Sequence, residues 1–123
     1  MGTFKVLIEV GDPSAQRFES FDALVDTGAT YTTLPASALR RLGVRPHRRS
    51  RFELADGTEK EWELGRTWIR LENKMEMTLV VFGEENAEPL LGAVTLEEFL
   101  LAPDPVRQQL VPVSGLMMGW RQQ

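Results

Sequence analysis

The chain has 123 residues, of which 42% are hydrophobic and 26% charged, and a formal net charge of -4. This length predicts one domain over residues 1–123, and the acidic balance argues against nucleic acid as the main partner. With no cysteine and one histidine, His47, the chain has no thiolate metal site and no multi-histidine metal site within one subunit. No apolar run approaches the roughly 20 residues that span a bilayer. We therefore expect a cytoplasmic protein with no metal and no membrane partner.

The first third of the chain predicts two strands and a short helix. Phe4 to Val10 reads as a strand, and Arg17 to Val25 returns as a second strand or a pair of short strands. Leu34 to Gly43 predicts a helix of about two turns, since Pro35 suits a first helical position and Gly43 suits the position just past a helix end.

The middle of the chain predicts two hairpins. Arg49 to Leu54 and Thr58 to Leu64 are the arms of the first hairpin, whose tip is Ala55-Asp56-Gly57. Asp-Gly favours a two-residue turn because it tolerates positive φ. Trp68 to Leu71 and Met75 to Phe82 form the second hairpin, and its all-apolar end predicts a central strand.

The last third predicts a second short helix and two final strands. Thr95 and Glu98 have the spacing of a capping box, which predicts a helix from Thr95 to about Leu101. Gln109 to Val113 and Leu116 to Trp120 are the predicted strands. In total the chain predicts about seven to nine short strands and two small helices, an all-β domain built as a compact barrel or sandwich.

One motif concentrates the chemistry. Asp26-Thr27-Gly28-Ala29 follows the apolar run Ala23-Leu24-Val25 and precedes Thr30-Tyr31-Thr32-Thr33. An acid therefore leaves a buried strand and enters a tight turn, which presents one carboxylate at the floor of a cleft. Because Asp and Gly are also common turn residues, this motif alone is equally compatible with an ordinary turn.

Three segments in order resemble the retroviral-type, or retropepsin-like, aspartic peptidases. Leu24 to Thr30 is similar to the active-site loop of that family. The Ala55-Asp56-Gly57 hairpin stands where the family has its flap, the hairpin over the cleft. Pro89 to Gly92 matches the second apolar-apolar-glycine motif of the family, which precedes a helix. The tail resembles a prokaryotic branch of small stand-alone domains; its matching segments are Leu90 to Glu97, Asp104-Pro105 and Leu110 to Pro112.

The resemblance implies an acid-protease-type barrel with one lobe per chain and an aspartic endopeptidase without a cofactor. Such an enzyme uses two carboxylates, one charged to accept a proton from water and one protonated to donate to the carbonyl oxygen. The chain supplies one such acid, so the resemblance implies a homodimer that brings together Asp26 of each subunit and acts on a polypeptide substrate.

The resemblance also assigns roles to the neighbours of Asp26. Thr27 would bond across the dimer axis, and Gly28 would let the backbone approach the catalytic water. Ala29 and Thr30 resemble positions that bind the substrate main chain, although retroviral members often have an acid where Thr30 stands. The tip residues Ala55, Asp56 and Gly57 would cover the substrate.

Other readings stay open. The same dimeric fold can hold a peptide without cutting it, and a small β-barrel interaction domain can use Asp-Thr-Gly as a turn. Trp62 can reach from the hairpin into the cleft, although a core position is favoured. The basic run from Arg45 to Arg51 favours a solvated outer strand balanced by glutamates over a phosphate-binding surface. His47 lies in that run, without the nucleophile pattern of a serine hydrolase.

Overall fold

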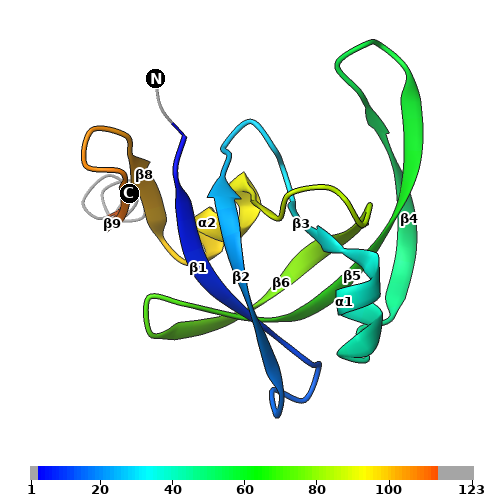
Figure 1. Cartoon of the computed structure of the whole chain (residues 1–123), viewed down its shortest axis with the longest axis horizontal. Coiled ribbons are helices and arrows are strands. Elements are labelled where there is room, and N and C mark those ends of the chain that lie inside the picture. Colours follow the sequence, from blue (N-terminus) through cyan, green and yellow to red (C-terminus); the bar gives the residue numbers. More distant parts are fainter. Residues whose placement is uncertain (1–2, 114–123) are drawn as a thin grey trace, which may run out of the picture.

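Strands make up most of the structure. The computed structural model describes residues 3–113, where nine strands and two helices follow one another (Figure 1). The strands are β1 (Lys5–Gly11), β2 (Phe18–Val25), β3 (Thr32–Pro35), β4 (Pro46–Glu53), β5 (Glu59–Leu71), β6 (Lys74–Gly83), β7 (Leu90–Leu91), β8 (Leu101–Asp104) and β9 (Gln109–Pro112). The helices are α1 (Ala36–Arg41) and α2 (Ala93–Glu98). The predicted all-β class is confirmed, and the predicted strand from Leu116 to Trp120 lies outside the described residues.

The main sheet closes on itself. Its order is β1-β2-β7-β3-β6-β5-β4, and β1 also pairs with β5, at Glu9–Arg70 and Val10–Ile69. This extra pairing joins the two sides of the sheet into a barrel and leaves β4 outside it, where the β4–β5 hairpin extends away from the body (Figure 1). The short strand β7 lies between the end of β2, to which it is parallel, and β3, to which it is antiparallel. Three segments that are distant in the sequence therefore meet at the end of β2.

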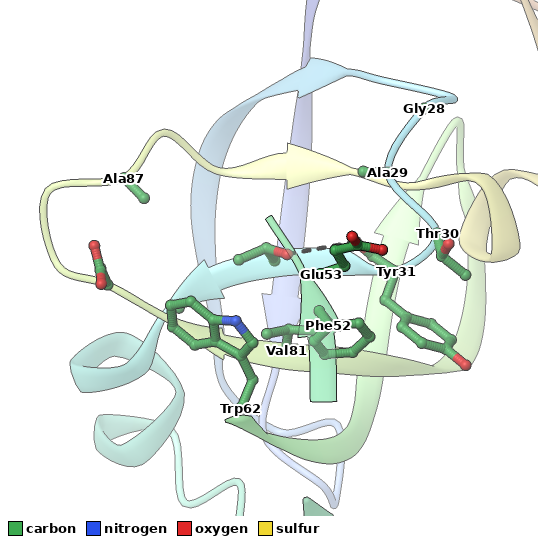
Figure 2. Close-up of a pocket in the computed structure, with 12 residues that line it drawn as sticks. Gly28, Ala29, Thr30, Tyr31, Phe52, Glu53, Trp62, Val81 and Ala87 are labelled. Atoms are coloured by element: carbon green, nitrogen blue, oxygen red, sulfur yellow. Dashed lines mark hydrogen bonds between the residues drawn. The ribbon is translucent and has the colours of Figure 1, made fainter. Parts of the chain in front are cut away.

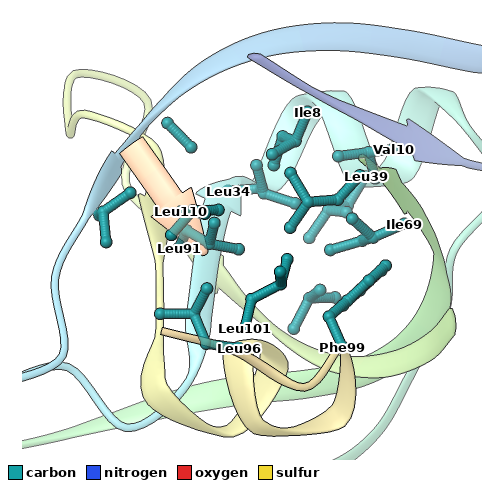
Figure 3. Close-up of a cluster of buried hydrophobic side chains, with 14 of the residues drawn as sticks. Ile8, Val10, Leu34, Leu39, Ile69, Leu91, Leu96, Phe99, Leu101 and Leu110 are labelled. Atoms are coloured by element: carbon teal, nitrogen blue, oxygen red, sulfur yellow. The ribbon is translucent and has the colours of Figure 1, made fainter. Parts of the chain in front are cut away.

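The core fills the barrel and extends under both helices. Figure 3 shows Ile8 and Ile69 from the sheet together with Leu39 from α1 and Leu96 from α2. Phe99, at the end of α2, is 2% exposed and is the largest fully buried side chain of the described residues. A six-residue helix is unstable alone, so α2 depends on this burial for its existence.

The two predicted hairpins share one long strand. The sequence predicted separate strands at Thr58–Leu64 and Trp68–Leu71, but β5 continues through 13 residues. It is continuous because β4 pairs with its first half and β6 with its second half, with both partners opposite Leu64 and Gly65. A Cβ on Gly65 would lie 2.8 Å from the Arg45 carbonyl oxygen, so this glycine admits β4 without breaking the strand.

The first helix starts later than predicted. Pro35 is the residue before α1, with φ -58° and ψ 133°, and not its first helical residue. Its extended ψ follows from its place at the end of β3, where it pairs with Gly83 of β6. The predicted end is confirmed, since Gly43 follows the C-cap Leu42 with φ 82°.

The second helix is displaced toward the N-terminus relative to the capping-box prediction. Its N-cap is Gly92, and Thr95 lies inside the helix with its hydroxyl turned to other partners. The helix ends at Glu98 and not near Leu101, because Leu100 takes a left-handed φ of 56° and Leu101 already belongs to β8.

Candidate active site

Asp26 follows the last residue of β2 and lies in a closed loop, the Asp26 loop (residues 26–31). Its N–H donates to the Leu91 carbonyl of β7 over 3.1 Å, which fixes the point where the chain leaves the sheet. The Gly28 N–H donates to Asp26 Oδ1 over 2.9 Å, and the Ala29 N–H donates to the Asp26 carbonyl over 3.1 Å. The predicted tight turn is thus present, and its backbone orients the carboxylate.

Glycine 28 leaves room beside that carboxylate. A Cβ at this position would lie 3.2 Å from Asp26 Oδ1, tighter than an ordinary van der Waals contact. Any side chain here would press on the carboxylate that the Gly28 N–H now binds. The neighbouring Thr27 is exposed, and its hydroxyl has no hydrogen-bond partner among residues 3–113.

The first turn of α2 holds the Asp26 loop from the other side. The Ala93 N–H donates to the Ala29 carbonyl over 2.8 Å, and the Val94 N–H donates to the Thr30 carbonyl over 3.0 Å. These are helix-terminal donors that lack partners within the helix. The approach requires Gly92, because a Cβ there would lie 2.5 Å from the Tyr31 carbonyl carbon. The Leu90-Leu91-Gly92 motif therefore acts as the backbone clamp of the Asp26 loop.

Three fully buried threonines, the threonine cluster (Thr32, Thr78 and Thr95), reinforce this clamp. Thr32 Oγ1 lies 2.7 Å from Thr95 Oγ1, and Thr78 Oγ1 lies 3.0 Å from the same Thr95 oxygen. Thr32 Oγ1 also accepts the Gly92 N–H over 3.0 Å. The cluster joins β3, β6 and α2 directly behind the Asp26 loop. Sequence reasoning missed it, because Thr95 is also an ordinary N-cap residue.

The tip of the β4–β5 hairpin differs from the predicted two-residue turn. It contains three residues, Ala55, Asp56 and Gly57; Leu54 and Thr58 pair at its base, and the Leu54 N–H donates to the Thr58 carbonyl over 2.7 Å. Gly57 has φ 88°, which fits a type I turn followed by a left-handed residue. Asp56 Oδ1 accepts the Thr58 hydroxyl and N–H, and these bonds lower the pKa of the Asp56 carboxyl.

The hairpin arms and the Asp26 loop line one pocket of about 410 Å³, the aromatic pocket (Figure 2). Gly28, Ala29 and Thr30 contribute the loop side. The other lining residues are Tyr31, Thr33, Phe52, Glu53, Trp62, Val81, Gly83, Glu84 and Ala87. The pocket thus begins two residues after Asp26 in the chain.

The structure brings together only some of the residues predicted for the site. Ala29 and Thr30 line the pocket with Gly28, whereas Asp26, Thr27 and the tip residues Ala55, Asp56 and Gly57 are not among its lining residues. Sequence reasoning missed Phe52 on the hairpin arm. The signal that points to it is the alternation of apolar side chains on the two arms behind the tip.

Trp62 occupies an intermediate position. It packs against a small core group of Leu64, Leu79 and Val81, and it also lines the aromatic pocket. Tyr31 and Phe52 pack edge-to-face in the same pocket wall, with ring centroids 6.0 Å apart and an interplanar angle of 67°. Trp62 thus has the core contacts that the sequence favoured and also the pocket position that was the alternative.

The basic run lies on β4, the edge strand of the sheet. Arg51 pairs with Glu59 at 3.3 Å and Arg49 with Glu61 at 3.7 Å, all with exposed side chains. The expected solvated strand balanced by glutamates is confirmed. Within residues 3–113 no group of three or more potential metal ligands is present. In the same range, no helix is long and apolar enough to cross a bilayer.

Residues 17–98, more than half of the chain, match the family model described as gag-polyprotein putative aspartyl protease. The chain belongs to this aspartyl protease family. Its fold is similar to the solution structure of the simian foamy virus (mac) protease, with a TM-score of 0.56 and 18% identity over 81% of this chain and 99% of the viral one. The EIAV protease in complex with the inhibitor HBY-793 gives a TM-score of 0.57 and 17% identity over 80% of this chain and 88% of that one.

No curated protein sequence matches the chain. The two likenesses confirm the predicted acid-protease-type fold with one lobe per chain, and the family match confirms the retropepsin-like assignment. From here the β4–β5 hairpin is called the flap.

Proposed function

We propose that this aspartyl protease family member is an aspartic endopeptidase that cleaves polypeptides as a homodimer, without a cofactor. The observation that carries the proposal is the fixed Asp26 carboxylate, which the Gly28 N–H orients at 2.9 Å beside the aromatic pocket. The motif occurs once per chain. Two-carboxylate chemistry therefore needs a second copy, and a two-fold axis through the Asp26 loops supplies it.

The proposed reaction uses the two Asp26 carboxyl groups as one acid–base pair. Two carboxylates about 3 Å apart share one proton, because both cannot ionise easily. The charged member takes a proton from water as the water oxygen attacks the peptide carbonyl carbon, and the protonated member donates to the carbonyl oxygen. When the tetrahedral intermediate collapses, the C–N bond breaks, the carboxyl group that took the water proton gives it to the leaving nitrogen, and the other carboxylate takes a proton from a hydroxyl of the intermediate, which restores the singly protonated pair. Aspartic proteases are the standard example of such a shared proton.

The neighbours of Asp26 have supporting roles in this proposal. The exposed Thr27 hydroxyl bonds across the dimer axis and locks the two loops together. Gly28 leaves space for the catalytic water, and Ala29 and Thr30 bind the substrate main chain. The flap tip, with Ala55, Asp56 and Gly57, closes over the substrate. Membership of the prokaryotic branch and a cytoplasmic location, expected from the sequence, also remain proposals.

The direct test is Asp26→Asn, which keeps the shape of the side chain and removes its charge. We expect peptide cleavage to be lost while the fold and the dimer persist, as judged by circular dichroism and sedimentation equilibrium. The control is Asp22→Asn, an exposed residue of β2, which should retain activity. Cleavage at the parental rate by the Asp26 variant contradicts the proposal. Peptide binding by a parent protein that never cleaves would favour the peptide-binding alternative.

A further inference from the structure

The aromatic pocket is large enough to hold one long side chain. Its volume is about 410 Å³, and Figure 2 shows Tyr31, Phe52 and Trp62 around Val81. Aromatic faces bind hydrocarbon stems by contact area and attract cations through the ring quadrupole. Because Gly28 to Thr30 form part of its lining, a side chain in this pocket belongs to a residue close to the bond that Asp26 attacks.

The charges at the pocket are mostly negative. Two glutamates, Glu53 from the flap and Glu84 from the loop after β6, are among its lining residues. Both carboxylates are exposed; Glu84 binds the Lys60 ammonium at 2.5 Å, whereas Glu53 has no ion pair among residues 3–113. The catalytic pair next to the pocket adds one further negative charge in its singly protonated state.

The chain already places one cation at the edge of this pocket. The Lys60 ammonium lies 4.5 Å from the centroid of the Trp62 ring while it binds Glu84. An aromatic face and a carboxylate thus hold an ammonium together at the pocket edge. The Tyr31–Phe52 pair and Glu53 offer the same two elements without a cation of their own.

We propose that the aromatic pocket binds a lysine or arginine side chain of the substrate, so that this peptidase prefers to cut beside a basic residue. The inference rests on the proposed function and adds its substrate class. The hydrocarbon stem lies against the aromatic walls, and the cationic end reaches Glu53. An acidic side chain would face two glutamates, and a neutral one would make no charge-assisted contact with Glu53. Lys60 opposes the preference, because it neutralises Glu84 and covers Trp62.

The test uses peptides that differ at one position. Each position around the scissile bond carries in turn lysine, arginine, glutamate or norleucine, which has a hydrocarbon side chain of similar length to lysine without the ammonium. At one position we expect kcat/KM for lysine or arginine to exceed that for norleucine by about tenfold, the scale of one cation–aromatic and carboxylate contact. The norleucine peptide also corrects for any loss of folded protein.

Four variants link the preference to the pocket. Glu53→Gln and Glu84→Gln should each reduce the lysine-to-norleucine ratio several-fold, and Lys60→Met should raise it. Glu61→Gln is the matched control, since Glu61 lies on β5 in the same hairpin as Glu53, is exposed and is not a lining residue; its ratio should equal that of the parent. A ratio near one at every position, or a basic preference that persists in the Glu53→Gln/Glu84→Gln double variant, overturns the inference.

Binding separates this inference from the proposed reaction. The affinities of the lysine and norleucine peptides for the Asp26→Asn protein, measured by calorimetry, should show the same preference without cleavage. If the parent does not cleave but this affinity preference is found, the pocket assignment stands and the peptidase proposal fails. Equal affinities of the two peptides contradict the pocket assignment even if cleavage occurs.

Discussion

The hydroxyl oxygens of Thr32 and Thr95 lie 2.7 Å apart in the interior, although 63 positions separate the residues in the chain. Both side chains are fully buried, and Thr32 also accepts the Gly92 N–H. The contact ties the strand after the Asp26 loop to the helix whose first turn binds that loop. The position of the Asp26 carboxylate thus depends on a neutral hydrogen-bond network that makes no contact with Asp26.

Thr95→Val should weaken both stability and catalysis. The substitution keeps the shape and leaves the Thr32 and Thr78 hydroxyls without their shared partner, which costs about 1–3 kcal/mol. Because the Asp26 loop then loses its support, we expect kcat to fall severalfold with a smaller change in KM. Urea unfolding and steady-state kinetics on one peptide measure the two effects.

Thr67→Val is the matched control for that prediction. Thr67 is equally buried and pairs with Thr78 across β5 and β6, but its hydroxyl donates to the Gly11 carbonyl. We expect a similar loss of stability and an unchanged kcat. If the two variants lose kcat equally under conditions where both are folded, the threonine cluster has no positioning role.

Asp12 should make the fold sensitive to acid. Its carboxylate accepts the Ser14 hydroxyl at 2.6 Å and the Gln16 and Arg17 N–H groups at 2.7 Å each. The Ser14 bond first, and then the backbone bonds, hold the pKa of Asp12 well below its ordinary value of 3.8. With a lowered folded pKa, this stabilisation is complete above the unfolded value and is lost as pH falls toward the folded value.

The measurement is urea unfolding of the parent and of Asp12→Asn at neutral pH and at several values below pH 4. The parent should lose stability progressively through the acidic range. The variant should be less stable at neutral pH, and its stability should fall less steeply as pH decreases. Asp22→Asn, at an exposed position of β2, should follow the parent. If the stability of the parent and of the Asp12 variant falls equally with pH below pH 4, Asp12 is excluded as a source of acid sensitivity.

The pH–rate profile should be a bell on the acidic side of neutrality. Loss of the shared proton as pH rises removes the acid, and gain of a second proton as pH falls removes the base. His47 is exposed on β4, so His47→Ala should leave the profile unchanged. A trapped acyl-enzyme should be absent because water is the nucleophile. A rate that reaches a plateau above neutral pH and collapses in the His47 variant points to another mechanism.

Local patterns in the sequence predicted most elements, and long-range contacts account for the errors. The strand predicted from Phe4 to Val10 and the helix end predicted at Gly43 rest on local signals, and the structure follows them. The predicted start of α2 was wrong because the spacing of Thr95 and Glu98 is that of an ordinary N-cap. Its partners Thr32 and Thr78 are visible only after folding, and the close approach of Gly92 to Tyr31 fixes the helix start instead.

The candidate site was predictable where it is a continuous motif. Asp26 to Thr30 form the tight turn that their residues predict. The pocket was not predictable, because it joins this loop to Phe52 and Glu53 on the flap and to Val81 on β6. These segments meet through the parallel pairing of β3 with β6 and the antiparallel pairing of β5 with both β6 and β4, and a one-dimensional pattern does not encode such pairings.

Mixed dimers test the central claim most directly, since the claim is that one active site needs Asp26 from both subunits. Parent and Asp26→Asn chains are mixed in varying ratios, allowed to exchange subunits, and assayed at constant total protein. If both carboxylates are required, activity falls with the square of the parent fraction, to about one quarter in an equal mixture. A linear fall, to about one half, shows that each subunit works alone and contradicts the shared-pair mechanism.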